Sequence, residues 1–167
     1  VSIEASEKVA VAQYLKGGVG ANTDPAFAYV PGLDTWLKEY RLATPAGTAA
    51  FNNNYASVVI KSSDVGSLKL NNAAIDTSLF SMITGTDYIQ GIIDLPLGLF
   101  DLKASSEFLV MLGGGSLADS YFTYGGSTFA PGISPPVEPD PIPVPASFLL
   151  VGLGLAGLSM SRRQFKK

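Results

Sequence analysis

The sequence predicts a mainly β protein, an antiparallel sandwich or small barrel with one or two short helices, followed by one C-terminal transmembrane helix. Three observations support this: short β-branched or aromatic stretches between turn residues, then a segment dense in proline, then an uncharged apolar run with a basic end. We therefore divide the chain into an extracytoplasmic soluble domain (1–130), a proline-rich stalk (131–145), a transmembrane helix (146–161) and a basic cytoplasmic tail (162–167).

Five segments of the first 130 residues are expected to form short strands. Several segments of about six residues are rich in Val, Ile, Tyr and Phe, and Gly, Asn or Ser bounds each of them. Periodicity leaves residues 6–15 open between a strand and a helix, and residues 17–25 have the composition of a loop. The predicted strands are 55–61, 65–70, 88–94, 107–112 and 120–124.

Two short helices are expected among these strands. Residues 34–42 fit a helix with Asp34 as its N-cap and one apolar side. That side is formed by Leu33, Leu37 and Tyr40. Residues 71–82 fit a second helix, capped by Asn72 or by Asp76.

Composition and charge argue against several classes of function. The chain has no Cys and no His, so it lacks thiolate ligands, the commonest metal ligand and the commonest general base. Through Pro145, fourteen acids outnumber seven bases for a net charge of −7, which does not suit nucleic-acid binding. Charged residues are only 15% of the chain, below the ~25% usual in soluble domains, so apolar surface is expected in a core or in lipid.

A search for catalytic motifs finds none that is well formed. Residues 17–20 (GGVG) are not followed by the Lys-Ser/Thr pair of a phosphate loop or by a long helix. Residues 113–115 (GGG) are expected to make a wide turn, and Ser116 has no histidine to activate it. Three acids recur every seventh residue and leave a paired-carboxylate glycosidase site conceivable: Asp87, Asp94 and Asp101. We predict no catalytic, cofactor-binding or metal-binding residue and a protein that is not an enzyme.

Aromatic and apolar residues are expected mainly in the core. Trp36 and Tyr40 share one predicted helix, and the apolar run 89–100 is interrupted by Pro96 and Gly98. The run belongs either to the core or to a surface patch that lies on a partner, and we favour the core. A further aromatic group lies just before the stalk: Tyr121, Phe122, Tyr124 and Phe129.

Residues 146–161 contain no charge and would span ~24 Å as a helix, somewhat less than the ~30 Å hydrocarbon core of a bilayer. A one-sided basic flank follows, consisting of Arg162, Arg163, Lys166 and Lys167. These side chains can reach the interface and would keep the C-terminus in the cytoplasm. Within the run lie four small residues: Gly152, Gly154, Ala156 and Gly157. Gly152 and Ala156 would allow another helix to approach closely, or these residues merely suit a weakly hydrophobic anchor that is easily processed.

The C-terminal pattern resembles a known family of bacterial sorting signals. The stalk holds seven of the eleven prolines, and Pro143, Pro145 and Ala146 lead into the Gly/Leu/Ala run that Arg162 and Arg163 close. Together they resemble the PEP-CTERM family in its Pro-x-Pro-Ala variant. The resemblance implies a Gram-negative exporter, recognition of the tail by an exosortase-type protease and a link to surface or exopolysaccharide matrix. The chain also opens without a leader, as expected of a mature exported protein.

Three hypotheses about function follow. In the first, the protein is a single-pass inner-membrane accessory subunit whose periplasmic domain packs on a larger complex, photosynthetic or respiratory for example. In the second, it is an exported cell-surface or exopolysaccharide-matrix protein whose tail is a cleaved sorting signal. The third, a carbohydrate-active enzyme, depends on the aspartates alone. No cofactor is expected, the bilayer would be contacted through residues 146–161, and residues 1–130 are assigned to no family.

Overall fold

The computed structural model describes residues 2–17, 24–46, 51, 53–116 and 119–128. The chain divides into two units, Val1–Pro131 and Gly132–Lys167, and all described residues belong to the first. The elements, in chain order, are β1 (Val11–Leu15), β2 (Ala26–Val30), η1 (Leu33–Thr35), β3 (Leu37–Thr44), β4 (Asn53–Lys61), η3 (Val65–Ser67), β5 (Lys69–Leu70), β6 (Ala73–Ala74), η4 (Thr77–Leu79), β7 (Phe80–Met82), β8 (Tyr88–Asp94), β9 (Gly98–Ser116) and β10 (Asp119–Tyr124). The predicted mainly β fold is confirmed, and the described helices are single 3₁₀ turns.

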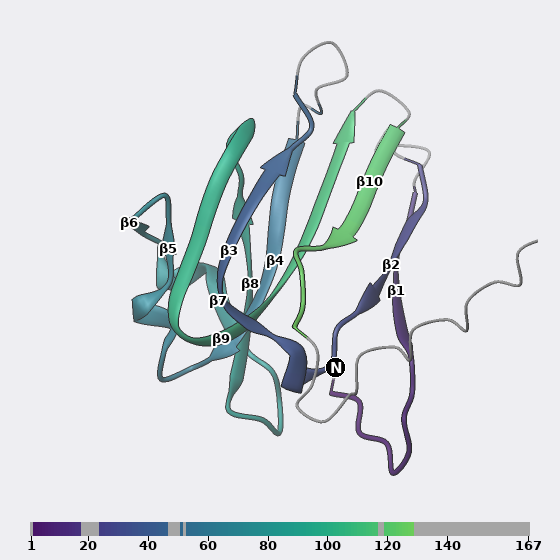
Figure 1. Cartoon of the computed structure of the whole chain (residues 1–167), viewed down its shortest axis with the longest axis vertical. Coiled ribbons are helices and arrows are strands. Elements are labelled where there is room, and N and C mark those ends of the chain that lie inside the picture. Colours follow the sequence, from purple (N-terminus) through teal and green to yellow (C-terminus); the bar gives the residue numbers. More distant parts are fainter. Residues whose placement is uncertain (1, 18–23, 47–50, 52, 117–118, 129–167) are drawn as a thin grey trace, which may run out of the picture. The chain divides into compact units, whose positions relative to one another are not determined.

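Strand β9 organises the molecule because its two halves pair with different strands (Figure 1). Its first half lies between β3 and β5, and its second half lies between β4 and β10. Strand β8 pairs with the free side of β4, and the short β7 pairs with β8. All of these pairings are antiparallel, so β9 runs through both halves of one curled sheet of eight strands.

The main core lies between the two halves of this sheet. Alternate residues of β4 and β8 point inward, as period-2 patterning requires: Ala56, Val58 and Ile60 are completely buried. From the other half come side chains of β3 and of the first part of β9, with Tyr40, Phe100 and Leu102 buried. The remaining buried members of this core are Leu68, Ile89, Ile93, Leu95, Phe108, Val110 and Leu112.

A bend in β9 lets the strand pass from one half of the sheet to the other. Lys103 is opposite Glu39, whereas Phe108 is opposite Leu37, so four residues of β9 bulge out opposite one residue of β3. The Tyr40 hydroxyl donates a hydrogen bond to the Phe108 carbonyl and accepts one from the Leu37 N–H at 3.1 Å. One buried tyrosine therefore links the backbone on the two sides of the bend.

Both predicted helices are wrong. Residues 37–44 form strand β3, preceded by the 3₁₀ turn 33–35, and no side-chain hydrogen bond caps that turn. The irregular pairing after Leu37 lets Leu37 and Tyr40, three apart as on a helix face, both face the core of a sheet. Residues 71–82 form a tight turn, β6, a 3₁₀ turn and β7. Asp76 does cap the 3₁₀ turn, since its carboxylate accepts from the Ser78 N–H at 2.9 Å.

The strand predictions at 55–61, 88–94, 107–112 and 120–124 are confirmed, within β4, β8, β9 and β10. The segment 65–70 is only partly a strand, because a 3₁₀ turn precedes the two residues of β5. The undecided segment 6–15 contains strand β1. Of the loop expected at 17–25, residues 18–23 lie outside the described residues.

The glycine run 113–115 is not a turn. All three glycines lie inside β9, opposite Asn53, Asn54 and Tyr55 of β4. The Tyr55 ring covers Gly113, and the Tyr121 ring covers Gly114 on the other face. A side chain on either glycine would collide with a ring, so large aromatic neighbours fill the space that the glycines leave.

Candidate functional site: an exposed aromatic face on the β1–β2 hairpin

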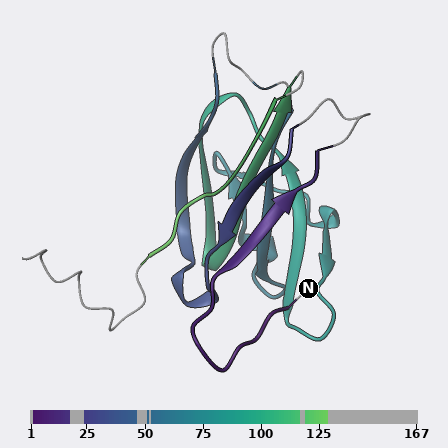
Figure 2. The same ribbon diagram turned by 90° about the vertical axis from the view of Figure 1, so that its right-hand side faces the viewer.

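Strands β1 and β2 form a two-stranded hairpin that lies against the outer face of the sheet (Figure 2). A two-stranded hairpin is marginally stable in water unless it packs on something. Here Ala28 of β2 is 7% exposed and packs with Leu109 and Met111, which point outward from β9. Four partly buried residues complete this second core: Val30, Trp36, Val59 and Phe122.

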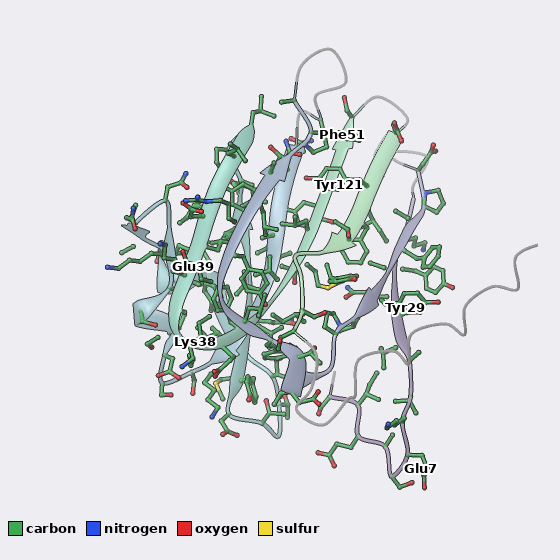
Figure 3. All side chains as sticks on the ribbon, in the orientation of Figure 1. Glu7, Tyr29, Lys38, Glu39, Phe51 and Tyr121 are labelled. Atoms are coloured by element: carbon green, nitrogen blue, oxygen red, sulfur yellow. The ribbon has the colours of Figure 1, made fainter. Side chains whose placement is uncertain are left out.

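The outer side of the hairpin carries three aromatic rings. Tyr14 of β1 is directly opposite Phe27 of β2, and Tyr29 follows Phe27 two residues later on the same side. The ring centroids of Tyr14 and Phe27 are 5.6 Å apart with planes at 29°, and those of Phe27 and Tyr29 are 6.3 Å apart and nearly perpendicular. These three residues, called the aromatic ladder below, are 73%, 57% and 59% exposed. In Figure 3 the labelled Tyr29 ring points away from the rest of the domain.

The ladder carries no formal charge. The fourth residue on this side of the hairpin is Ala12, opposite Tyr29. The nearest charged residues along the chain are Lys16, just after β1, and Asp24, shortly before β2. Because these two have opposite signs, the ladder is a neutral strip on a domain in which acids outnumber bases.

An apolar groove of about 330 Å³ lies beside the hairpin. Its lining includes Trp36, whose indole N–H donates to the Pro31 carbonyl at 3.2 Å and whose ring meets Tyr88 edge to face at 5.6 Å. Other apolar residues of the lining are Ile3, Val9, Val11, Leu33 and Leu109. Most of the residues that line the groove are apolar.

A smaller hollow of about 280 Å³ lies over β8 and β7 and is lined by Ser57, Leu79, Ser81, Gln90, Gly91 and Ile92. Its hydroxyl and amide groups carry no charge. Gly91 has a packing role, since the Phe80 ring fills the space where its Cβ would be. This hollow therefore offers no titratable group for catalysis.

The charged side chains of β3 and β9 form exposed ion pairs. Arg41 donates to both oxygens of Asp101 at 2.8 and 3.2 Å, and the bond from Arg41 holds the pKa of Asp101 below its usual range. Lys103 lies 2.8 Å from Glu39, and Lys38 lies 3.5 Å from Glu107. Two of these pairs join residues that lie directly opposite each other, Arg41 with Asp101 and Glu39 with Lys103, so Asp101 is engaged in a cross-strand contact.

The three aspartates do not form a common site in the described part of the chain. Asp101 lies within β9 beside Arg41, while Asp94 ends β8 opposite Tyr55. Asp87 lies just before β8, and its carbonyl accepts the Ser62 N–H. The described residues contain no group of three His, Cys, Asp or Glu that could hold a metal ion.

A partly buried polar contact joins the edge strand β10 to β4. The Tyr121 hydroxyl donates to the Asn54 side-chain oxygen at 2.8 Å, and the Tyr121 ring meets Phe51 edge to face at 5.0 Å (Figure 3). Burial, with a smaller contribution from the charge of Tyr55, raises the pKa of Tyr121 to about 12. Tyr121 therefore stays neutral at ordinary pH and acts as a structural donor.

The other predicted aromatic residues divide between core and surface. Tyr40 is in the main core, Trp36 is in the groove and the second core, and Tyr124 is 43% exposed. In the run 89–100 every second residue of β8 is buried, whereas Ile92, Leu97 and Leu99 are 60–78% exposed. The core prediction is thus right for five of the twelve residues of the run. Phe129 lies outside the described residues.

The predicted anchor and sorting residues also lie outside the described residues. They are Pro143, Pro145, Ala146, Gly152, Gly154, Ala156, Gly157, Arg162 and Arg163. Within the described residues, no helix has the length and hydrophobicity needed to cross a bilayer.

Sequence reasoning missed the ladder, although its signal is present. The segment Ala26–Val30 reads AFAYV, with small residues on one side and aromatic residues on the other. Large rings at alternate positions opposite alanines predict a strand whose small side packs closely and whose aromatic side remains outside.

Comparison with known proteins identifies both parts of the chain. Residues 141–163 match the PEP-CTERM protein-sorting motif, which confirms the resemblance in the tail. Residues 1–114 match the family described as IgGFc binding protein, so the N-terminal domain, which the sequence analysis assigns to no family, does have one. Neither the curated proteins nor the solved structures contain a match to this chain.

The match to residues 1–114 begins before the hairpin and ends within the second half of β9. It covers the ladder, the groove and the curled sheet except for the end of β9 and strand β10, and it spans more than half of the chain. The chain belongs to the IgGFc binding protein family.

Proposed function

We propose that this protein is an exported cell-surface or extracellular-matrix protein whose β domain is a binding module and whose C-terminal tail is a sorting signal removed during export. The observation that carries the proposal is the combination of the PEP-CTERM motif at residues 141–163 with a family whose description names a binding activity. This favours the surface or matrix hypothesis over an accessory subunit of a membrane complex.

The described surface supports binding rather than catalysis. Solvent-exposed aromatic rings on a supported hairpin offer contact area at low entropic cost, because Tyr and Phe have few rotatable bonds. The acids that could suggest hydrolysis are engaged in ion pairs or separated on different strands. A non-enzymatic module is therefore the simplest function for this domain.

The family description names the IgG Fc region as a bound protein. For this chain we take from it only the general role of a recognition domain. We assign recognition to residues of the hairpin. In the described part of the chain, the aromatic pairs whose rings are mostly exposed lie on this hairpin.

The test is the fate of the protein in its native host. We would tag the domain before β1 and compare the natural chain with R162Q/R163Q, which removes the basic end of the motif. K166Q/K167Q is the matched control, because both lysines lie beyond the matched residues 141–163. We expect the natural chain and the control to be shortened and extracellular, and R162Q/R163Q to remain full length with the cell.

A natural chain that stays full length in the inner membrane, co-migrating in stoichiometric amount with a large complex, would overturn this proposal. That result would restore the membrane-subunit hypothesis. Equal retention of the two double variants would mean that charge in general, and not the motif, governs sorting.

A further inference from the structure

We infer that the aromatic ladder (Tyr14, Phe27 and Tyr29) binds a neutral polysaccharide through stacking of sugar rings on its aromatic rings. This inference rests on the proposed function, because a protein at the surface or in the matrix meets such polymers. It names the class of partner and the residues that recognise it.

The chemistry of the ladder suits a neutral sugar. Each sugar ring has a face of C–H groups with partial positive charge, and the face of an aromatic ring is electron-rich. Tyr14 and Tyr29 add phenol hydroxyls that can donate and accept hydrogen bonds with sugar hydroxyls. The ladder therefore offers both kinds of contact that a sugar presents, and no ionic contact.

Charge argues against anionic partners. Through Thr128 the chain has twelve acids and seven bases, a net charge of −5. No charged side chain lies among the four residues of the ladder side of β1 and β2, and Lys16 beyond β1 is balanced by Asp24 before β2. Anionic polymers and anionic lipid headgroups would be repelled by the domain as a whole, whereas a neutral polymer would not.

Area argues against a second copy of this chain as the partner. With about 200 Å² for each ring residue and exposures of 57–73%, the ladder offers roughly 400 Å². A stable protein interface needs about 800 Å² from each partner. A narrow strip of rings is enough for a linear polymer, which can make further contacts through repeated units along its length.

The hairpin also holds the ladder in place before any ligand binds. Ala28, between Phe27 and Tyr29, is buried against Leu109 and Met111. This packing fixes the strand that carries two of the three rings, so binding costs little conformational entropy.

The test is native affinity electrophoresis of the full chain in mild detergent. The gels contain hydroxyethyl cellulose or galactomannan, both neutral, or the polyanion alginate. We expect at least one neutral polymer to retard the protein and alginate not to do so. Y14A/F27A should weaken this retardation by about tenfold or more. The matched control Tyr124→Ala removes an exposed tyrosine of β10 and should leave retardation unchanged.

Two further variants separate the contact from the fold. Phe27→Leu keeps an apolar residue in β2 but removes the ring, and it should lose retardation while the thermal unfolding midpoint changes little. Y14F/Y29F keeps all three rings and should retain most of the retardation. Retardation by neither neutral polymer, equal retardation by alginate, or equal loss in Tyr124→Ala would overturn the inference.

The failures of the two proposals can be distinguished. An exported, shortened protein that no neutral polymer retards would contradict only the inference about the ladder. A full-length protein held in the inner membrane would contradict the proposed function, whatever the gels show.

Discussion

Replacing Tyr40 with Phe should weaken the fold because it removes one oxygen at the bend of β9. Tyr40 is 2% exposed, and its hydroxyl bonds both the Phe108 carbonyl and the Leu37 N–H. The substitution leaves two backbone groups without this partner while the ring stays in edge-to-face contact with Phe108 at 5.0 Å.

The expected loss is about 2–3 kcal/mol in the free energy of unfolding. Leaving a buried donor or acceptor unsatisfied costs about 1–3 kcal/mol, and the space left by one oxygen adds little. Tyr40→Leu should cost more, since it also loses an aromatic contact worth about 0.5–1.5 kcal/mol.

Urea denaturation of the purified chain at pH 7 measures this effect. We expect a lower midpoint with an unchanged slope, since the substitution changes stability and not the area exposed on unfolding. Tyr124→Phe is the control, because Tyr124 is 43% exposed, and it should change stability by less than about 0.5 kcal/mol. A Tyr40→Phe midpoint equal to that of the control would refute the idea that this hydroxyl holds the bend.

Three other substitutions test the packing and the pH dependence. Gly113→Ala should destabilise the domain by about 1–3 kcal/mol, because its Cβ would collide with the Tyr55 ring, and Tyr55→Ala should relieve most of this cost in the double variant. Ile60→Ala should cost about 2–5 kcal/mol in urea denaturation, since Ile60 is completely buried in the main core. Tyr121 keeps its proton to higher pH in the folded state than in the unfolded state, so it contributes stability below pH ~10 that is lost as pH rises to about 12. Tyr121→Phe should therefore flatten the alkaline decrease of the unfolding midpoint, and an unchanged decrease would contradict this assignment.

Strands with regular alternation were the most predictable elements. In β4 and β8 each second residue is buried, and nearly all of the buried ones are apolar. Their predicted bounds agree with the structure to within two residues. The alternation of residue types is sufficient to predict these two strands, because one face of each strand is buried and the other is not.

The wrong predictions of a helix at 34–42 and a turn at 113–115 have one physical cause. In both, contacts with residues from other strands override the preference of the local sequence. The bulge opposite Lys38 gives β3 a spacing that looks helical in sequence, and only its pairing with β9 shows why. Three consecutive glycines predict a turn, yet the Tyr55 and Tyr121 rings make Gly113 and Gly114 good strand residues. The two rings reach these glycines through the pairing of β9 with β4 and β10, which the composition of the glycine segment alone does not show.

The sequence points to aromatic residues as the candidate site, but it does not show which aromatic residues form it. The absence of His and Cys directs attention to apolar and aromatic surfaces. The residues singled out were Trp36, Tyr40 and the group at 121–129, of which Tyr40 is core and Tyr121 is structural. The ladder is not predicted because residues 6–15 stay open between a strand and a helix and no predicted strand covers residues 26–30, so Tyr14 cannot be placed opposite Phe27.

The most direct measurement is the intact mass of this protein in the extracellular and inner-membrane fractions of its native host. We expect an extracellular protein that is shorter than the unprocessed chain by the segment following the cut near the motif at residues 141–163. A full-length mass confined to the inner membrane would contradict an exported surface or matrix protein.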